Sequence, residues 1–154
     1  MITIPVTTPR NYLSTIVALN IRSPESTGDW HSSSTFSNDK LPLENYFFGD
    51  NQPKNTNHLL DDMGVIDGTE RLNRMGYFPE NTPVWIADHP RACVDYLYYS
   101  VLKTGILGFI TLDDWFPSIE DKQRVYQLLD VMEPYLTSRE REILSQWKQQ
   151  NPLS

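Results

Sequence analysis

The chain has few of the features that would indicate a disulfide framework, a membrane anchor or a secreted protein. Cys93 is the only cysteine among 154 residues, so no disulfide can form within the chain. No apolar run approaches the roughly 20 residues that span a bilayer. The N-terminus, MITIPVTTPR, lacks the basic start and apolar centre of a signal peptide. These absences predict a cytoplasmic protein without a membrane span.

Basic residues are also the minority, with 13 Lys and Arg against 20 Asp and Glu, for a formal net charge of −7. A surface of this sign repels nucleic-acid phosphates, which argues against a nucleic-acid partner. It suits a protein that is simply solvated, or one that meets a basic partner protein. The sequence leaves both interpretations open, and it is compatible with an oligomer.

Apolar mass, in contrast, is plentiful. Hydrophobic residues make up 39% of the sequence and aromatic residues 12%, which is too much for a disordered protein. The length fits one domain over residues 1–154. The patterns described below predict an α+β fold, a predominantly α-helical single domain with a small β element and a long ordered loop region.

The most regular stretch is Val84 to Val101, which predicts a strand, a turn and a helix. Residues 84–86 are β-favouring, and Asp88 is a good helix N-cap. Pro90 would then lie in the first helical turn, where its missing N–H costs nothing. The apolar residues that follow recur at helical spacing.

The C-terminus predicts a helical pair over residues 118–150. Ser118 would cap a helix ending at Met132, and Thr137 with Glu140 forms a capping box for the last helix. The apolar side chains of the two helices fall on one face of each, at Val125, Leu128, Leu129, Met132, Ile143, Leu144 and Trp147.

The remaining elements are short. Thr8 and Pro9 with the apolar spacing after them favour a helix over residues 12–19, although its β-branched residues also allow a strand. Two further short helices are expected at residues 57–63 and 69–75, each closed by a glycine. Residues 106–110 (ILGFI) are expected to form a strand or a buried link. The predicted core comprises Leu13, Ile16, Val17, Trp85, Val94, Leu97, Val101, Leu128, Leu129, Leu144 and Trp147.

Residues 21–57 form a loop-rich excursion, dominated by Ser, Thr, Asn, Asp, Gly and Pro. Loops of this length inside a compact domain are functional or disordered. Aromatic and leucine side chains are spread through this one, and they would be costly to leave in water. We therefore expect an ordered excursion that is pinned to the body of the domain and contributes to partner binding.

The candidate partner-binding residues lie in expected loops where acidic and aromatic residues occur close together in the sequence. They are Glu25, Asp29, Trp30, His31, Asp50, Asp113, Asp114 and Trp115. Aromatic residues are favoured in the centres of protein interfaces. No catalytic residue, metal ligand or cofactor is predicted, because the three histidines lack metal-ligand spacing and the Ser23–Ser34 stretch lacks a phosphate-binding glycine pattern.

Two other functions remain as alternatives. One is a small metal- or nucleotide-dependent enzyme that uses Asp29 and His31, with His89 as a third group. The other is a transcriptional regulator, because LTSREREIL at residues 136–144 is similar to the opening of the helix-turn-helix of response-regulator-type transcription factors. The acidic balance argues against the second alternative.

Residues 86–98 (IADHPRACVDYLY) resemble a segment of the antitoxins of AbiE-type toxin–antitoxin systems, which act in abortive infection. The likeness is carried by Ala87, Pro90, Arg91, Ala92, Asp95, Leu97 and Tyr98. The resemblance implies an antitoxin-like protein that neutralises a cognate toxin of the nucleotidyltransferase type, either by direct contact or by acting on it. Of these, we expect a non-enzymatic antitoxin that binds its toxin. That family usually begins with a winged-helix DNA-binding domain, whereas the first 80 residues here contain no recognisable wing.

Overall fold

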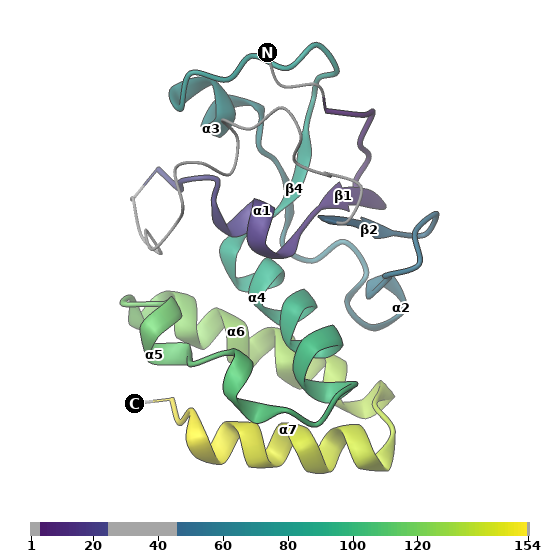
Figure 1. Cartoon of the computed structure of the whole chain (residues 1–154), viewed down its shortest axis with the longest axis vertical. Helices are drawn as coiled ribbons and strands as arrows, with labels where there is room; N and C mark the ends of the chain where they lie inside the picture. The colour runs from purple at the N-terminus through teal and green to yellow at the C-terminus, as the bar shows by residue number, and fades with distance from the viewer. Residues whose placement is uncertain (1–3, 25–45, 154) are drawn as a thin grey trace.

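A small sheet and a group of helices lie toward opposite ends of the long axis of the molecule, and helix α4 (His89–Leu97) joins them (Figure 1). The computed structural model describes residues 4–24 and 46–153. The architecture is mixed α+β with more helix than strand, which confirms the predicted fold class. Within the two described stretches, no helix is long and apolar enough to cross a membrane.

The sheet has four short strands in the order β2–β1–β4–β3. Their bounds are β1 Asn11–Leu13, β2 Phe47–Gly49, β3 Val65–Asp67 and β4 Trp85–Ala87. Strand β1 pairs antiparallel with β2 and parallel with β4, and β3 runs antiparallel to β4. Strands of three residues depend on packing for their stability. Leu13, Val17 and Leu72 provide it, since they are buried in one cluster with side chains of the sheet.

The helices beside α4 are mostly short in the first half of the sequence and long at the end. They are α1 Thr15–Leu19, α2 Asn57–Leu60, α3 Thr69–Arg74, α5 Leu112–Trp115, α6 Ile119–Met132 and α7 Ser138–Gln150. A π-helical turn, η3 (Tyr98–Leu102), continues α4, and 3-10 turns lie at η4 (Leu107–Phe109) and η5 (Glu133–Tyr135). Helix α4 packs against α1 on the sheet side and α6 on the helical side.

The predicted strand, turn and helix over residues 84–101 are confirmed. Strand β4 leads into α4, and the Asp88 carboxylate accepts a hydrogen bond from the backbone N–H of Arg91 at 2.8 Å. Burial raises the pKa of Asp88, and the hydrogen bond from the Arg91 N–H opposes that rise. Pro90 lies in the first turn, as its missing N–H predicts.

The C-terminal helices are also confirmed, together with their caps. Ser118 accepts from the N–H of Asp121, and the capping box of Thr137 and Glu140 is complete in both directions. All seven apolar side chains predicted on the inner faces of these helices are buried. Local capping and helical spacing therefore determined both elements.

The helix predicted over residues 12–19 is wrong in its first half. Tyr12 and Leu13 belong to β1, and α1 begins only at Thr15, whose positive φ of 53° turns the backbone sharply from strand to helix. Leu13 lies between two neighbouring strands, and this position in the sheet outweighs its helical spacing. Thr8 forms an isolated bridge with the start of β1 rather than a helix cap.

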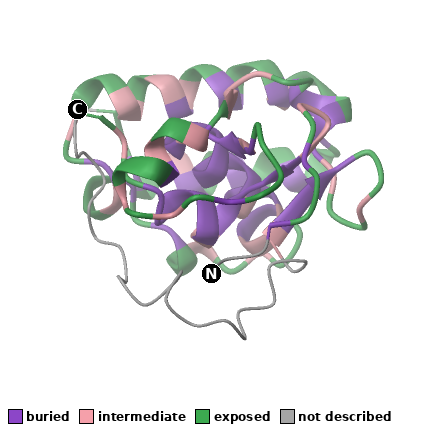
Figure 2. Ribbon diagram, turned by 90° about the horizontal axis from the view of Figure 1, so that it is seen from above, coloured by how far each residue is buried: buried purple, intermediate pink, exposed green. Residues whose placement is uncertain are grey.

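Residues 106–110 differ from the expected strand or buried link. Leu107–Phe109 form the 3-10 turn η4, with Ile106 and Phe109 exposed and only Ile110 fully buried. Nine of the eleven predicted core residues are buried, whereas Ile16 and Trp85 are only partly covered. The buried segments lie inside the molecule and the exposed surfaces on its outer helices and loops (Figure 2).

The loop-rich region of residues 21–57 contains a strand that the sequence did not reveal. Phe47 and Phe48 lie in β2, and both are buried. Their burial agrees with the expectation that aromatics attach this region to the domain. The expectation for its central part, residues 25–45, lies outside the described residues.

Two glycines with positive φ near the short helices allow a matched test of the fold. Gly76 follows the end of α3, as predicted. The helix expected over residues 57–63 is wrong in its second half, because α2 ends at Leu60, Asp61 has a positive φ of 50°, and Gly64 lies in the turn before β3. Gly64 and Gly76 both have positive φ, 78° and 89°. A Cβ on Gly64 would lie 2.7 Å from the Cβ of Arg91, whereas a Cβ on Gly76 would meet nothing within 4 Å. We expect Gly76→Ala to cost about 1 kcal/mol of unfolding free energy, and Gly64→Ala about 1 to 3 kcal/mol more. Urea denaturation of both variants measures the difference, and equal losses would contradict the close packing at Gly64.

Candidate functional site

The most concentrated polar chemistry among the described residues is a buried ion pair on α4. The Nε of Arg91 lies 3.0 Å from Oδ1 of Asp95, one helical turn further along. Both side chains are 0% exposed. A charge without a partner in such a place would carry a large desolvation cost, so the surroundings have to satisfy both groups.

The guanidinium of Arg91 finds acceptors on three separate segments. Its Nη1 donates to the backbone carbonyl oxygens of Asp61 and Met63, at 2.9 and 2.6 Å. Its Nη2 donates to the hydroxyls of Tyr12 and Thr56, at 2.9 and 3.0 Å. Arg91 therefore connects α4 to β1, to the start of α2 and to the loop before β3.

The carboxylate of Asp95 is enclosed by hydroxyl donors. Its Oδ1 accepts from Thr56 at 2.5 Å, and its Oδ2 accepts from Tyr12 at 2.8 Å and from Ser14 at 2.7 Å. Ser14 occupies the N-cap position of α1 but does not cap that helix, because its hydroxyl is directed to Asp95. We call the side chains of Tyr12, Ser14, Thr56, Arg91 and Asp95, with the backbone oxygens of Asp61 and Met63 that Arg91 contacts, the buried network.

Electrostatics agree with a closed structural role for the buried network. Burial raises the pKa of the Tyr12 hydroxyl, and the nearby Asp95 carboxylate raises it further. Burial alone would lower the pKa of Arg91, but Asp95 and Tyr12 together outweigh it and hold that pKa above its usual value. The proton stays on Tyr12 and the positive charge on Arg91, and these two groups keep that state while they connect the segments around them.

The buried network was not predicted, although part of its signal is in the sequence. Arg91 and Asp95 are four residues apart on a helix whose other residues are mostly apolar. A helix that is apolar on all sides is buried, so a charged pair within it has to be buried as well. The partners Tyr12, Ser14 and Thr56 could not be identified, because no local pattern links them to α4.

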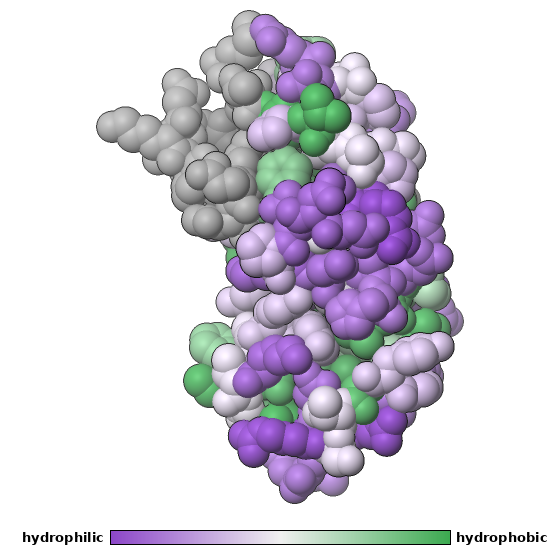
Figure 3. All heavy atoms as spheres, turned by 90° about the vertical axis from the view of Figure 1, so that its right-hand side faces the viewer, coloured by the Kyte–Doolittle hydropathy of each residue, from purple (hydrophilic) through white to green (hydrophobic). Residues whose placement is uncertain are grey.

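A second polar group, exposed in this case, lies around Arg10. Its Nε contacts Oδ2 of Asp50 at 2.9 Å, and its Nη1 contacts Oδ1 of Asp61. Asn57 also donates to Asp50, at 3.0 Å. Arg10 and Asn57 together hold the pKa of Asp50 below its usual value. This side of the molecule, where β2 and α2 lie, is largely hydrophilic at mid-height (Figure 3).

Acidic and aromatic side chains meet at the junction of α5 and α6, which we call the α5–α6 surface and define as residues 113–121 (DDWFPSIED). It carries four carboxylates, of which Asp113 pairs with Lys122 at 2.7 Å. The half-buried Trp115 stacks on Tyr96, with ring centroids 5.6 Å apart. Ile119 is 41% exposed beside them. This surface therefore combines negative charge with apolar area.

A hollow of about 450 Å³ opens beside β2. It is lined by Pro5, Val6, Thr8, Asn11, Phe47, Asn51 and Gln52. A smaller hollow of about 220 Å³ lies against the same N-terminal segment and is bordered by residues 81–83 and Trp85. Val6 lines both hollows and is 73% exposed. No sequence pattern indicated the larger hollow, because two stretches far apart in the sequence, residues 5–11 and 47–52, form it.

The predicted partner-binding residues fall in different places. Glu25, Asp29, Trp30 and His31 lie outside the described residues. Asp50 follows β2 in the exposed group around Arg10, and residues 113–115 form most of α5. Strand β2 and helix α5 lie on opposite sides of the molecule (Figure 1), so the structure does not bring Asp50 and the α5 residues into one surface.

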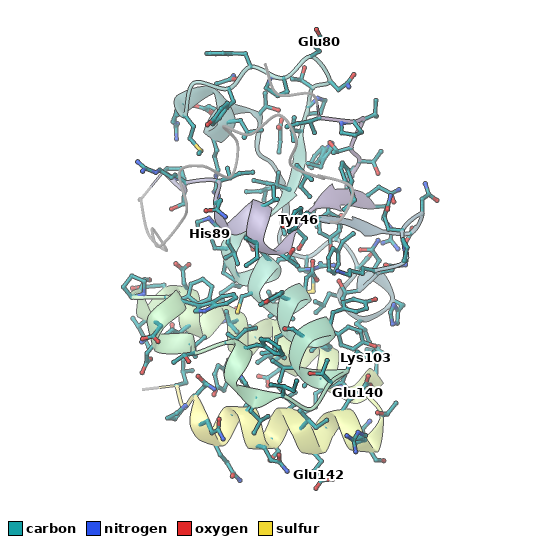
Figure 4. All side chains as sticks on the ribbon, viewed as in Figure 1. Tyr46, Glu80, His89, Lys103, Glu140 and Glu142 are labelled. Atoms are coloured by element: carbon teal, nitrogen blue, oxygen red, sulfur yellow. The ribbon has the colours of Figure 1, made fainter. Side chains whose placement is uncertain are left out.

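For the alternative of a small enzyme, the described residues bring no histidine together with carboxylate or cysteine side chains in a metal-binding group. His89 lies at the start of α4 inside the molecule, and its Nε2 is 2.7 Å from the backbone oxygen of Ile21 (Figure 4). His58 is exposed on α2. Among the residues that the structure describes, no group of three His, Cys, Asp or Glu side chains could hold a metal ion. Burial raises the pKa of the Cys93 thiol, which disfavours a reactive thiolate there.

Comparison of the sequence and structure with protein-family models, with curated proteins and with solved structures found no match. The interpretation of the surface therefore rests on its own chemistry.

The buried network predicts an asymmetry between two aspartates. Asp95→Asn leaves the Arg91 charge buried without its counter-ion, and we expect a loss of about 3 to 5 kcal/mol in unfolding free energy. The matched control is Asp113→Asn, which removes an exposed ion pair with Lys122 and should cost no more than about 1 kcal/mol. Chemical denaturation of both variants measures the two losses. Similar values would mean that the buried pair does not organise the fold.

Proposed function

We propose that this is a cytoplasmic, antitoxin-like protein that neutralises a cognate toxin by direct contact through the α5–α6 surface. The observation that carries this proposal is the combination of four carboxylates with the stacked Trp115 and the exposed Ile119. Charges at an interface steer association, and a rigid aromatic ring can act as an anchor. Trp115 is already held against Tyr96, so little side-chain freedom is lost on binding.

The charge of the surface fits the toxin class that the resemblance implies. A nucleotidyltransferase has to hold the phosphates of its substrates, and basic side chains commonly supply that binding. An acidic protein of net charge −7 is complementary to such a site. The proposed partner is therefore a toxin with a basic, phosphate-binding surface.

The resemblance itself supports the scaffold more than the surface. Each of the seven residues that carry it is buried in the structure, including both members of the ion pair on α4. Buried residues of this kind maintain a fold. The surface that meets the partner is consequently expected to be particular to this protein and its toxin.

The test is co-expression of the protein with each neighbouring reading frame, followed by a growth assay and tagged co-purification. We expect one neighbour to be toxic alone and harmless in a stable complex with this protein. Asp114→Lys reverses an exposed charge on α5 and should weaken the complex about tenfold at low salt, mainly through slower association. Surface plasmon resonance at two salt concentrations measures this effect.

The matched control is Glu142→Lys, the same change of charge at an exposed position on α7. Glu142 lies outside the α5–α6 surface, at the end of the long axis away from the sheet (Figure 4). It should leave association with the toxin nearly unchanged. Equal effects of the two reversals would contradict the α5–α6 surface as the contact. The absence of any toxic neighbour that this protein neutralises would contradict the antitoxin function.

A further inference from the structure

The described residues that line the hollow beside β2 are all uncharged, although the protein is strongly acidic. Its polar groups are the hydroxyl of Thr8 and the side-chain amides of Asn11, Asn51 and Gln52, and the rest of the lining is apolar. A charged ligand would lose its hydration here without meeting a counter-charge. Amides and hydroxyls match the hydrogen-bonding groups of a neutral ligand such as a peptide backbone.

The floor of the hollow is held in place by hydrogen bonds. The side-chain oxygen of Asn11 accepts from the backbone N–H of Asn51 at 3.0 Å, which fixes the turn after β2. The hydroxyl of Thr8 accepts from the N–H groups of Arg10 and Asn11, at 3.2 and 3.0 Å. The hollow is therefore formed before any ligand binds, which limits the cost of ordering it.

Strand β2 borders the hollow and lies at the edge of the sheet. Backbone hydrogen bonds toward β1 are made by Tyr46 and Asp50. Because hydrogen-bonded pairs alternate along antiparallel strands, Phe47 and Gly49 direct their N–H and C=O groups away from β1. These outward groups are the ones available to another strand.

Of these two residues, Gly49 already has backbone hydrogen-bond partners among the described residues. The N–H of Gly49 donates to the C=O of Lys54 at 3.0 Å, and its C=O accepts from the N–H of Gln52 at 2.9 Å. For Phe47, no such backbone partner lies within the described stretches. Its side chain lines the hollow at the same point.

We propose that this hollow binds an extended, uncharged peptide segment of a partner protein, which adds to the edge of β2 at Phe47. The segment would exchange two backbone hydrogen bonds with Phe47, as in other cases of strand addition. A residue opposite Phe47 directs its side chain to the same face of the sheet. That side chain enters the hollow between Val6 and the amide groups, and this site is independent of the α5–α6 surface.

The experiment is an NMR titration of the isotope-labelled protein with a library of capped, uncharged hexapeptides built from Val, Leu, Thr, Ser and Asn. We expect shifts in the backbone amide of Phe47 and in the side-chain amides of Asn11, Asn51 and Gln52. A second library carries a backbone N-methyl group at every other residue. It should bind about tenfold more weakly, because the methylated residues lack the N–H donors that pair with the edge of β2. A library with Lys or Glu at alternate positions should be weakened similarly.

The variant is Val6→Asp, which places a charge at the rim of the hollow, at a position 73% exposed. Its matched control is Phe78→Asp, the same added charge at a position 70% exposed that lines neither hollow. We expect at least about a tenfold loss of peptide affinity for the first variant and none for the second. The exposure of both positions keeps the fold intact, and this is checked by the amide spectra.

Shifts that map elsewhere, equal losses in the two variants, or no shifts at millimolar peptide would each overturn the proposal. The titration contains no toxin, so its outcome is separate from that of the co-expression experiment. Binding here without toxin rescue would leave a peptide-binding site in a protein of another function. Rescue without binding would leave the antitoxin proposal and remove this site.

Discussion

The buried ion pair of Arg91 and Asp95 is the constraint on which the rest of the structure depends. Each charge is removed from water, so each hydrogen-bonding position around it has to be filled. The groups that fill them come from β1, from the start of α2 and from the loop before β3, as well as from α4 itself. Segments that are weak on their own, such as strands of three residues, are thereby fixed at one position against the joining helix.

The same network reaches the surface. Thr56 donates to Asp95 inside the molecule, and its neighbours Asn55 and Asn57 contact the Tyr99 hydroxyl and the exposed Asp50. The turn after β2 is therefore held by hydrogen bonds that reach the interior through Thr56 and its neighbours, and by the exposed ion pair of Arg10 with Asp50. This attachment positions the turn whose residues Asn51 and Gln52 line the hollow beside β2.

The residues that form the scaffold and the residues proposed to bind partners are different sets in this protein. The likeness to AbiE-type antitoxins lies in residues that are buried, and these residues explain how strand β4 meets helix α4. The features proposed to meet partners, the α5–α6 surface and the hollow, are formed by other residues. A scaffold resemblance of this kind, which stays a prediction, is compatible with a surface that is adapted to a particular partner, because function is determined by sites on the fold.

The sequence alone determined the elements whose signals are local. The caps at Asp88, Ser118 and Thr137 and the apolar faces behind them predicted α4, α6 and α7, because a cap and a helical face are set by residues within a few positions. Gly76 likewise marked the end of α3, whereas α2 ends at Leu60, before the turn that contains Gly64.

Only the tertiary structure decided the elements and sites that need distant partners. Residues 11–13 became a strand because Leu13 lies between two strands far away in the sequence. Ile106 and Phe109 stayed exposed because other side chains filled the core. The buried network and the hollow each join segments that are 30 or more residues apart. Pairing over such separations depends on the three-dimensional arrangement of the whole molecule, and a local pattern of residues does not encode it.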